Sequence, residues 1–264
     1  MTFAFHQPAT SPEAVALLGS IPDSTPLAGG MTLLPTIKQR LATPAALIDL
    51  SRIPAMSSIS VEGDTLAIGA MARHVDVAES AIVAAAIPLL AKLAAGIGDP
   101  AVRNRGTIGG SVANNDPSAD YPAAVLGLGA TIVTDRRKIA AADFFTGMFE
   151  TALEPDEVIT SLRFPVPVRG GYAKFKSPAS RYAVVGVCVV QSPGGVCVAV
   201  TGAGPGVFRV PEMETALAGS FTPAAVASIK VPADNMSSDI HADSEYRAHL
   251  ITVMAKKAVA AAIG

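Results

Sequence analysis

The sequence has no tryptophan, only two cysteines in 264 residues, and few charged side chains, which make up 16% of the total. Two cysteines cannot supply the set of thiolates that usually holds an iron–sulfur cluster, so any such cluster would belong to a partner protein. The formal net charge of −2 at pH 7 gives no electrostatic reason to expect a nucleic-acid partner. No apolar run reaches the ~18 residues that a membrane span needs.

Several chemistry-bearing patterns are also missing. The four histidines are scattered without paired metal-ligand spacing, so we expect no metal site. The G-x-S-x-G motif of many serine hydrolases does not occur. The first residues lack the basic-then-apolar order of a signal peptide, and a cytoplasmic protein is expected.

The two cysteines lie on neighbouring apolar runs that are typical of strands. Cys188 and Cys197 are separated by Ser192–Gly195, which we interpret as a hairpin loop. In that register Cys188 lies opposite Ala199, and Cys197 lies opposite Val190. The cysteines are then not cross-strand partners, so the pattern favours two small buried hydrophobes over a disulfide.

The remaining chain is rich in alanine, valine and glycine and alternates helix and strand signals. The segment 75–96 is helix-prone, whereas the polar segment 98–122 has no helical period and is expected to be a functional loop. Two prolines and two glycines within 165–171 mark the best domain boundary. Beyond it, the sequence predicts three strands (172–176, 183–191 and 196–201) followed by helices (212–218, 222–229 and 243–263).

Two glycine-rich segments carry the chemistry. In Ala28-Gly29-Gly30-Met31-Thr32, paired glycines precede a predicted helix, so backbone N–H groups could approach an anion closely. An ordinary structural turn gives the same pattern. The second segment, Thr107-Ile108-Gly109-Gly110-Ser111, is followed by the amide- and carboxylate-rich stretch 113–120. Together they offer donors for phosphates and acceptors for hydroxyl groups, as a dinucleotide needs. Neither segment fits a Rossmann or P-loop motif.

These segments, together with Asn104-Arg105-Gly106, Leu153-Glu154-Pro155-Asp156-Glu157 and Ser244-Glu245-Tyr246-Arg247, closely resemble the FAD-binding medium subunits of the molybdenum hydroxylases. The likeness is greatest to the carbon monoxide dehydrogenase type and covers essentially the whole chain. It implies an α+β fold, with a two-part FAD-binding domain of the vanillyl-alcohol-oxidase (PCMH) type over 1–167. The two subdomains would span about 1–54 and 55–167, and a small α+β domain with a three-stranded antiparallel sheet and helices would span 168–264.

The resemblance also assigns the cofactor contacts. FAD would lie against Ala28, Gly29, Gly30, Met31, Thr32, Leu33, Ile97, Thr107, Ile108, Gly109, Gly110, Ser111, Asn114, Asp116, Asp120, Ile159 and Lys176. Both glycine segments would contact the pyrophosphate, and Lys176 would lie near the isoalloxazine, where a cation stabilises anionic reduced flavin. Two positions depart from the family pattern: Ser111 stands where many relatives have Asn, and Met31 stands where His or Ser is frequent.

The resemblance implies an electron-transfer subunit that has no catalytic acid or base of its own. A [2Fe–2S] small subunit would deliver electrons, a molybdenum-cofactor large subunit would oxidise the substrate, and the complex would be a dimer of heterotrimers. Two alternatives stay open: a self-sufficient flavin-dependent oxidoreductase of the same fold, and a cofactor-free assembly module. The sequence leaves open the substrate and the final acceptor, which could be a quinone, NAD or oxygen.

Overall fold

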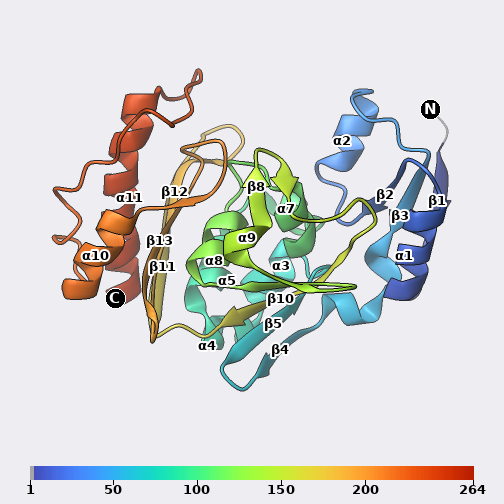
Figure 1. Ribbon diagram of the computed structural model, residues 1–264, viewed down its shortest axis with the longest axis horizontal. Coiled ribbons are helices and arrows are strands. Elements are labelled where there is room, and N and C mark those ends of the chain that lie inside the picture. The colour runs from blue at the N-terminus through green and yellow to red at the C-terminus, as the bar shows by residue number, and fades with distance from the viewer. Residues whose placement is uncertain (1–2) are drawn as a thin grey trace.

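The computed structural model describes residues 3–264, so Met1 and Thr2 of the expected FAD-binding domain lie outside the described residues. Three sheets follow one another along the long axis of the molecule (Figure 1). The first has three strands, the second five and the third four. A separate two-stranded hairpin completes the strands of the described part.

The N-terminal sheet is parallel, with strand order β1-β3-β2. Its elements are β1 (Ala4–His6), α1 (Ser11–Ser20), β2 (Ser24–Leu27), α2 (Leu33–Lys38) and β3 (Ala46–Asp49). The expected strand–turn–helix around Ala28–Thr32 is therefore confirmed as β2, a loop and α2. Because the strands are parallel, their carboxyl ends meet at one edge of the sheet, and this loop leaves from that edge. Two 3₁₀ turns, η1 (Leu50–Arg52) and η2 (Pro54–Ser57), lead onward.

The central sheet is antiparallel, with strand order β4-β5-β10-β6-β7. Its strands are β4 (Ile59–Glu62), β5 (Thr65–Gly69), β6 (Thr131–Thr134), β7 (Lys138–Ala140) and β10 (Ile159–Pro165). The remaining elements of this region are α3 (His74–Glu79), α4 (Ala81–Ala86), α5 (Pro88–Ala95), α6 (Pro100–Arg103), α7 (Ile108–Asn114), α8 (Tyr121–Gly127), α9 (Ala141–Phe144), β8 (Phe145–Gly147) and β9 (Glu150–Thr151). Leu66, Ile68, Leu162 and Phe164 of the sheet and Leu90, Leu93 and Ile108 of the helices are buried in one core.

The segment 98–122, expected to be a functional loop without a helical period, contains helices. Helices α6 and α7 lie within it, and α8 begins at Tyr121. Asp99 and Thr107 cap the first two helices with their side-chain oxygens, which accept from Val102 N and Gly110 N. Helices of four and seven residues are too short to produce a detectable period. The helical segment expected over 75–96 is interrupted twice, at Ser80 and Ile87, and forms α3, α4 and α5.

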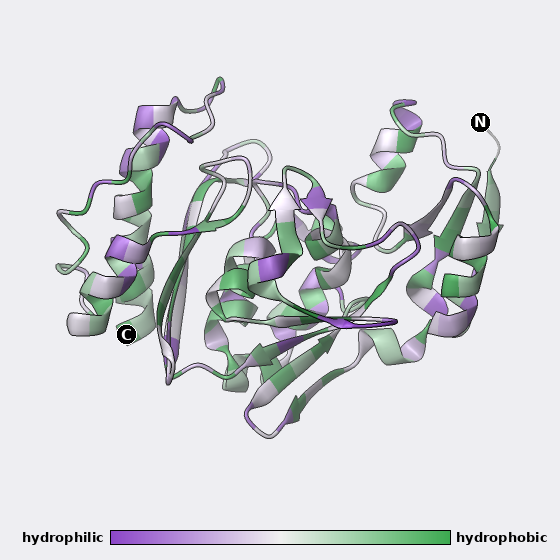
Figure 2. Cartoon of the chain, viewed as in Figure 1, coloured by the Kyte–Doolittle hydropathy of each residue, from purple (hydrophilic) through white to green (hydrophobic). Residues whose placement is uncertain are grey.

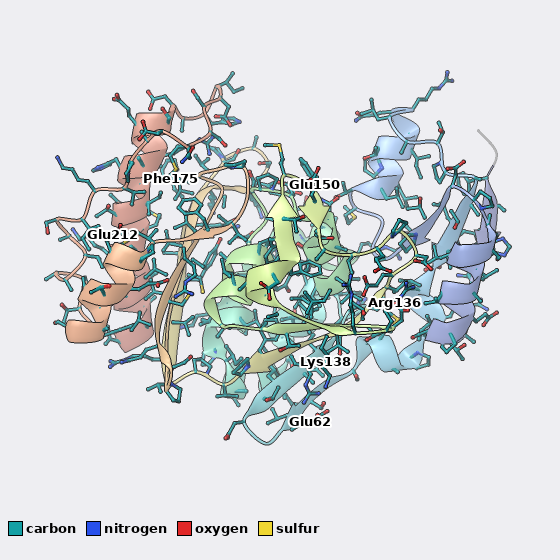
Figure 3. All side chains as sticks on the ribbon, viewed as in Figure 1. Glu62, Arg136, Lys138, Glu150, Phe175 and Glu212 are labelled. Carbon is teal, nitrogen blue, oxygen red and sulfur yellow. The ribbon has the colours of Figure 1, made fainter. Side chains whose placement is uncertain are left out.

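A charged turn joins β6 to β7 in the central sheet. Arg136, labelled in Figure 3, pairs with Glu154 at 3.0 Å and with Asp156 at 3.2 Å. Arg137 pairs with Glu157 at 2.7 Å, and the Glu157 side chain is fully buried. These pairs fix the segment 154–157 just before β10.

The C-terminal sheet has four strands instead of the expected three, because a two-residue edge strand pairs with β13. The elements are β11 (Arg169–Lys176), β12 (Ala183–Ser192), β13 (Gly195–Thr201), β14 (Phe208–Arg209), α10 (Pro211–Gly219) and α11 (Ser244–Ile263). The hairpin register is confirmed: Cys188 pairs with Ala199 and Val190 with Cys197. Both cysteines are free. The helix expected over 222–229 is wrong, since that segment forms turns.

Strand β12 is buried on both faces. Val185, Val187 and Val189 pack with α10 and α11 in the C-terminal core, whereas Cys188 and Val190 belong to the core of the central region. Figure 2 shows hydrophobic residues recurring along this sheet and on the helices that cover it. A strand that is covered on both faces has apolar residues at successive positions and not at alternate ones, as in 183–190. The same burial raises the pKa of the Cys188 thiol and raises that of Cys197 to about 12, so both thiols stay protonated.

Candidate functional site

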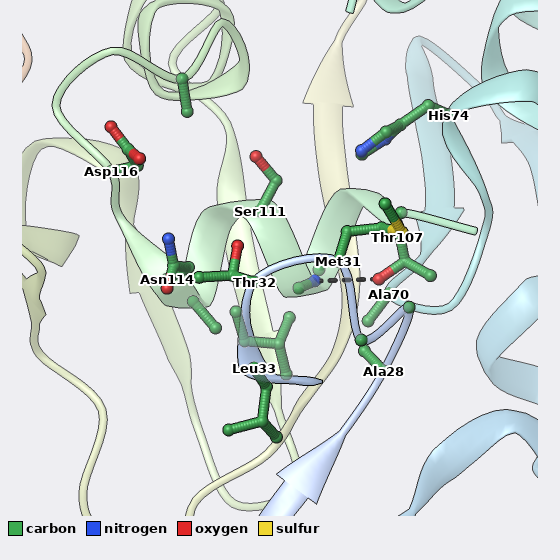
Figure 4. Close-up of a pocket in the computed structure, with 18 of the residues that line it drawn as sticks. Ala28, Met31, Thr32, Leu33, Ala70, His74, Thr107, Ser111, Asn114 and Asp116 are labelled. Atoms are coloured by element: carbon green, nitrogen blue, oxygen red, sulfur yellow. Dashed lines mark hydrogen bonds between the residues drawn. The ribbon is translucent and has the colours of Figure 1, made fainter. Parts of the chain in front are cut away.

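A cavity of about 500 Å³ lies where the N-terminal sheet, the central helices and the C-terminal sheet meet. Its volume is in the range of roughly 300–1,000 Å³ that is typical of small-molecule sites. Most of the predicted contact residues line it: Ala28, Gly29, Gly30, Met31, Thr32, Leu33, Ile97, Thr107, Gly109, Gly110, Ser111, Asn114, Asp116, Asp120 and Ile159. Figure 4 shows the loop after β2 facing helix α7 across this space.

The loop after β2 offers a row of backbone donors. Within residues 3–264, the amide N–H groups of Gly29 to Leu33 have no hydrogen-bond acceptor in the protein. Gly30 has a φ of +73°, a conformation that glycine adopts without strain. A Cβ on Gly29 would lie 2.2 Å from the Arg105 carbonyl oxygen, so only glycine allows the loop to pack here. The loop therefore presents a series of unbonded backbone N–H groups, which is suited to binding an anion such as pyrophosphate.

The second glycine segment differs from the first in its hydrogen bonding. It is the N-terminal turn of helix α7, and its amide groups from Ile108 to Ser111 are bonded, whereas the Thr107 amide has no acceptor among the described residues. Ile108 N donates to the Ala72 carbonyl and Gly109 N to the Ala70 carbonyl at 2.8 Å, the bond drawn dashed in Figure 4. Gly110 N donates to Thr107 Oγ1 at 3.1 Å. The side-chain hydroxyl of Ser111, in contrast, has no partner among the described residues and is half-buried at the cavity.

The glycines of α7 serve close packing. A Cβ on Gly109 would lie 2.4 Å from the Ala70 Cβ, and one on Gly110 would lie 3.3 Å from the Ala28 Cβ. Helix α7 can therefore approach both the end of β5 and the first glycine loop. The first segment supplies most of the free amides, and the second supplies the surface opposite them.

Asp120 is bonded mainly to the chain's own side chains. Tyr172 donates its hydroxyl to Asp120 Oδ1 at 2.5 Å, and Lys174 Nζ donates to the same carboxylate at 2.9 Å. Burial raises the pKa of Asp120, while the Lys174 ammonium and the Tyr172 hydroxyl act in the opposite direction. With two strong donors in place, the carboxylate stays ionised in our interpretation. Asp120 lines the cavity and also joins α8 to β11.

The lysine that is bonded beside the cavity is Lys174, which is half-buried, and not Lys176. Besides Asp120, Lys174 Nζ bonds the Gly96 and Arg181 carbonyl oxygens, both at 3.0 Å. Lys176 is exposed at the end of β11 and does not line the cavity. Ile108, the other predicted contact outside the lining, has its side chain fully buried in the central core. The structure therefore brings together all the predicted residues except these two.

Cations hold the segment before α6 in place. Arg103 donates to the Ile97 carbonyl at 2.9 Å and to the Gly98 carbonyl at 3.0 Å. Arg181 donates to the Gly98 carbonyl at 3.2 Å. Together with the Lys174 bond to Gly96, these contacts hold the carbonyl groups of three successive residues, 96 to 98, in place. Ile97 is thereby held at the cavity as an apolar lining residue, as predicted.

His74 belongs to the site although the sequence did not single it out. His74 lines the cavity and is 5% exposed, and its ring packs against Tyr121 with centroids 5.4 Å apart. Burial, with the Arg103 guanidinium as a smaller cause, lowers the pKa of His74 to about 4. The only signal in the sequence is a histidine that follows strand β5, and a single histidine in that position is uninformative.

Comparison with known proteins decides the family. A family model described as the FAD binding domain in molybdopterin dehydrogenase matches residues 1–167. The chain belongs to this family. FAD is accordingly its cofactor, and the expectation of an FAD-binding flavoprotein is confirmed. The free amides of 29–33 and the close approach of α7 fit such a group, although the individual contacts stay predictions.

Similar proteins extend over the whole chain. The carbon monoxide dehydrogenase medium chain of Hydrogenophaga pseudoflava is 38% identical, covering 98% of this chain and 96% of the relative. The nicotine 6-hydroxylase medium subunit of Paenarthrobacter nicotinovorans is 35% identical, covering 97% and 95%. A solved structure of the Hydrogenophaga carbon monoxide dehydrogenase, a form lacking the Mo-pyranopterin moiety, superposes with a TM-score of 0.89 at 39% identity, covering 99% of this chain and 97% of that one. The expected α+β fold is confirmed at this level.

Two features are absent from residues 3–264. No three His, Cys, Asp or Glu side chains gather closely enough to hold a metal ion. No helix of this part is both long and apolar enough to cross a bilayer.

Proposed function

We propose that this chain is the electron-transfer flavoprotein subunit of a molybdenum hydroxylase complex. It would accept electrons from a [2Fe–2S] small subunit and pass them to a final acceptor, while a molybdenum-cofactor large subunit oxidises the substrate. When bound, FAD supplies both one- and two-electron chemistry, which suits a relay between these partners. The proposal includes a dimer of heterotrimers located in the cytoplasm.

One observation supports this role most strongly. The five unbonded amides of Gly29–Leu33 face the packed surface of α7 across a single cavity. In this arrangement the chain binds and orients the pyrophosphate by backbone donors, which need no side-chain charge. We also propose that residues 1–167 form a two-part domain of the vanillyl-alcohol-oxidase (PCMH) type and that 168–264 form a smaller second domain.

The substrate of the complex is left open by the relatives themselves. Two medium subunits of similar identity, 38% and 35%, belong to enzymes named for carbon monoxide and for nicotine. In our proposal the molybdenum subunit selects the substrate, so this chain does not. A carbon monoxide dehydrogenase and an aldehyde, xanthine or N-heterocycle dehydrogenase are all compatible with it.

The test compares the isolated chain with the co-expressed complex. We expect flavin absorption bands in the isolated chain and substrate oxidation only in the complex. We also expect the flavin of the isolated chain to stay oxidised when carbon monoxide, aldehydes, xanthine or nicotine are added without partners. Bleaching by one of these compounds would favour the self-sufficient oxidoreductase. A colourless chain that takes up no added FAD would contradict the proposal and favour an assembly module.

A further inference from the structure

His74 and Tyr121 form a buried polar pair whose hydrogen-bonding capacity is unused by the protein. Within residues 3–264, His74 Nδ1 and the Tyr121 hydroxyl are buried without any hydrogen-bond partner. The side chains touch through their rings, which are tilted by 47°. Buried polar atoms are nearly always bonded, because an unpaired one costs about 1–3 kcal/mol. Both of these atoms are shielded from the cavity, so the atom of the pair that is open to a ligand is the other ring nitrogen, His74 Nε2.

The backbone fixes His74 beside the first turn of α7. Its amide donates to the Gly106 carbonyl at 2.9 Å, and Ile108 N donates to the Ala72 carbonyl at 3.0 Å, so 72–74 and 106–108 run as a short ladder. A Cβ on Gly106 would lie 2.5 Å from His74 Nε2. The imidazole therefore fits only because residue 106 is glycine.

The imidazole faces the cavity through Nε2. This atom has no hydrogen-bond partner among the described residues and is not among the fully buried atoms. Figure 4 shows the His74 ring pointing into the space above α7, on which Ser111 also opens. The charged group that acts on the ring is the Arg103 guanidinium, and the neighbouring titratable group is Tyr121. Burial, and to a smaller extent this nearby cation, disfavours the imidazolium, so His74 is a neutral ring with one donor and one acceptor.

We propose that His74 is a cofactor-contacting residue that hydrogen-bonds bound FAD through Nε2, with Tyr121 behind it as a positioning residue. The inference rests on the proposed function, namely that this cavity holds FAD. A hydrogen bond from a neutral ring orients the cofactor without adding charge to the site. It complements the amide row of Gly29–Leu33, which lies on the other side of Gly106: a Cβ on Gly29 would be 2.7 Å from the Gly106 Cα.

The first test asks whether one substitution stabilises the FAD-free protein and at the same time weakens FAD binding. His74→Phe removes both ring nitrogens and keeps the packing against Tyr121. Because it deletes unpaired buried polar atoms, it should raise the melting temperature of the FAD-free protein. The same change should weaken FAD binding by about tenfold, the loss of one good hydrogen bond. His74→Gln, whose amide nitrogen can reach a position similar to Nε2, should restore affinity to within about threefold.

The second test observes the ring directly. The chain has four histidines, so ¹⁵N-histidine spectra can be assigned with single substitutions. Addition of FAD should shift the Nε2 resonance of His74 and leave those of exposed His241 and His249 unchanged. In Tyr121→Phe, which keeps the ring contact with His74, the FAD-free protein should melt higher, while the His74 shift on FAD addition and the FAD affinity should stay near those of the wild type.

The outcomes separate the two proposals. If wild-type protein binds no FAD, the proposed function itself fails. If wild-type protein and His74→Phe bind FAD equally well and the His74 resonances do not move, the proposed function stands and the role of His74 is refuted. A lower melting temperature of FAD-free His74→Phe, with unchanged FAD affinity, would show that His74 serves packing only.

Discussion

Lys174 Nζ lies 2.9 Å from the Asp120 carboxylate, and the side chains are 10% and 4% exposed. The pair joins strand β11 of the C-terminal sheet to the residue that precedes helix α8. Tyr172, on the same strand, donates to the same carboxylate. Asp120 lines the cavity, so strand β11 helps to hold one residue of its wall in place.

Removal of the Lys174 ammonium should destabilise the protein strongly. Lys174→Met would leave Asp120 as a buried carboxylate without its cation, which costs about 3–5 kcal/mol in comparable cases. Urea unfolding of the FAD-free protein measures this loss. The matched control is Lys176→Met, two residues along the same strand but exposed, where the change should stay within about 0.5 kcal/mol. If Lys176→Met instead altered the flavin reduction potential, the isoalloxazine contact predicted for Lys176 would be supported.

A carboxylate at position 111 should weaken FAD binding. Ser111 lies on α7 opposite the free amides of 29–33, where an added negative charge would repel pyrophosphate. We expect Ser111→Glu to raise the dissociation constant by at least about tenfold. Ser111→Asn, the residue expected in many relatives, should leave it within about threefold. Quenching of flavin fluorescence provides the measurement. Equal affinities for all three proteins would place the pyrophosphate elsewhere.

A methyl group at Gly109 should destabilise the fold and not merely the cofactor site. The new Cβ would lie 2.4 Å from the Ala70 Cβ and 2.7 Å from its carbonyl oxygen. Overpacking of this kind costs about 1–3 kcal/mol. Gly219→Ala is a suitable control because a Cβ there meets nothing within 4 Å, and it should be neutral or stabilising by less than about 1 kcal/mol. Thermal unfolding of the FAD-free variants distinguishes them; an unchanged Gly109→Ala would mean that β5 and α7 can separate freely.

The stability of the FAD-free protein should fall between pH 6.5 and pH 4 in a manner that depends on His74. Its pKa is lowered from 6.5 to about 4 in the folded state. In that window the unfolded chain binds the proton and the folded protein does not, so stability is lost as the pH falls, by up to about 3 kcal/mol. His74→Gln should flatten the profile, whereas His249→Gln, at an exposed position, should not. Identical profiles for wild type and His74→Gln would contradict the burial of a neutral ring.

The sequence predicted the location of the site better than the role of each residue in it. The glycines of both segments and Ile97, Asp116 and Ile159 do line one cavity. The hydrogen bonds of the second segment could not be predicted, because the Ile108 and Gly109 amides donate to the carbonyl groups of Ala72 and Ala70, which belong to another segment of the chain. The resemblance assigned both segments to the pyrophosphate, but among the described residues five free amides lie at 29–33, by the first segment, and only the Thr107 amide and the Ser111 hydroxyl lie in the second.

The lysine shows why individual contacts are harder to predict. Lys174 and Lys176 have the same parity on a strand, so alternation alone places both on one face. A bulge between Phe175 and Lys176 breaks that alternation, and nothing local in the sequence marks it. The unpaired atoms of His74 and Tyr121 were equally invisible, since they depend on which groups fail to meet in three dimensions. Helix α6 could not be predicted either, because a helix of four residues is too short to show a period in the sequence.

The double burial of β12 has a consequence for attempts to divide the protein. Cys188 packs so closely on α8 that a Cβ on Gly127 would lie 3.1 Å from its Sγ. A fragment ending near residue 167 would lose this cover and expose the apolar side of α8 to water, which favours aggregation. We therefore expect the intact chain to melt in a single calorimetric transition, with no autonomous flavin-binding fragment released by limited proteolysis at the 165–171 connection.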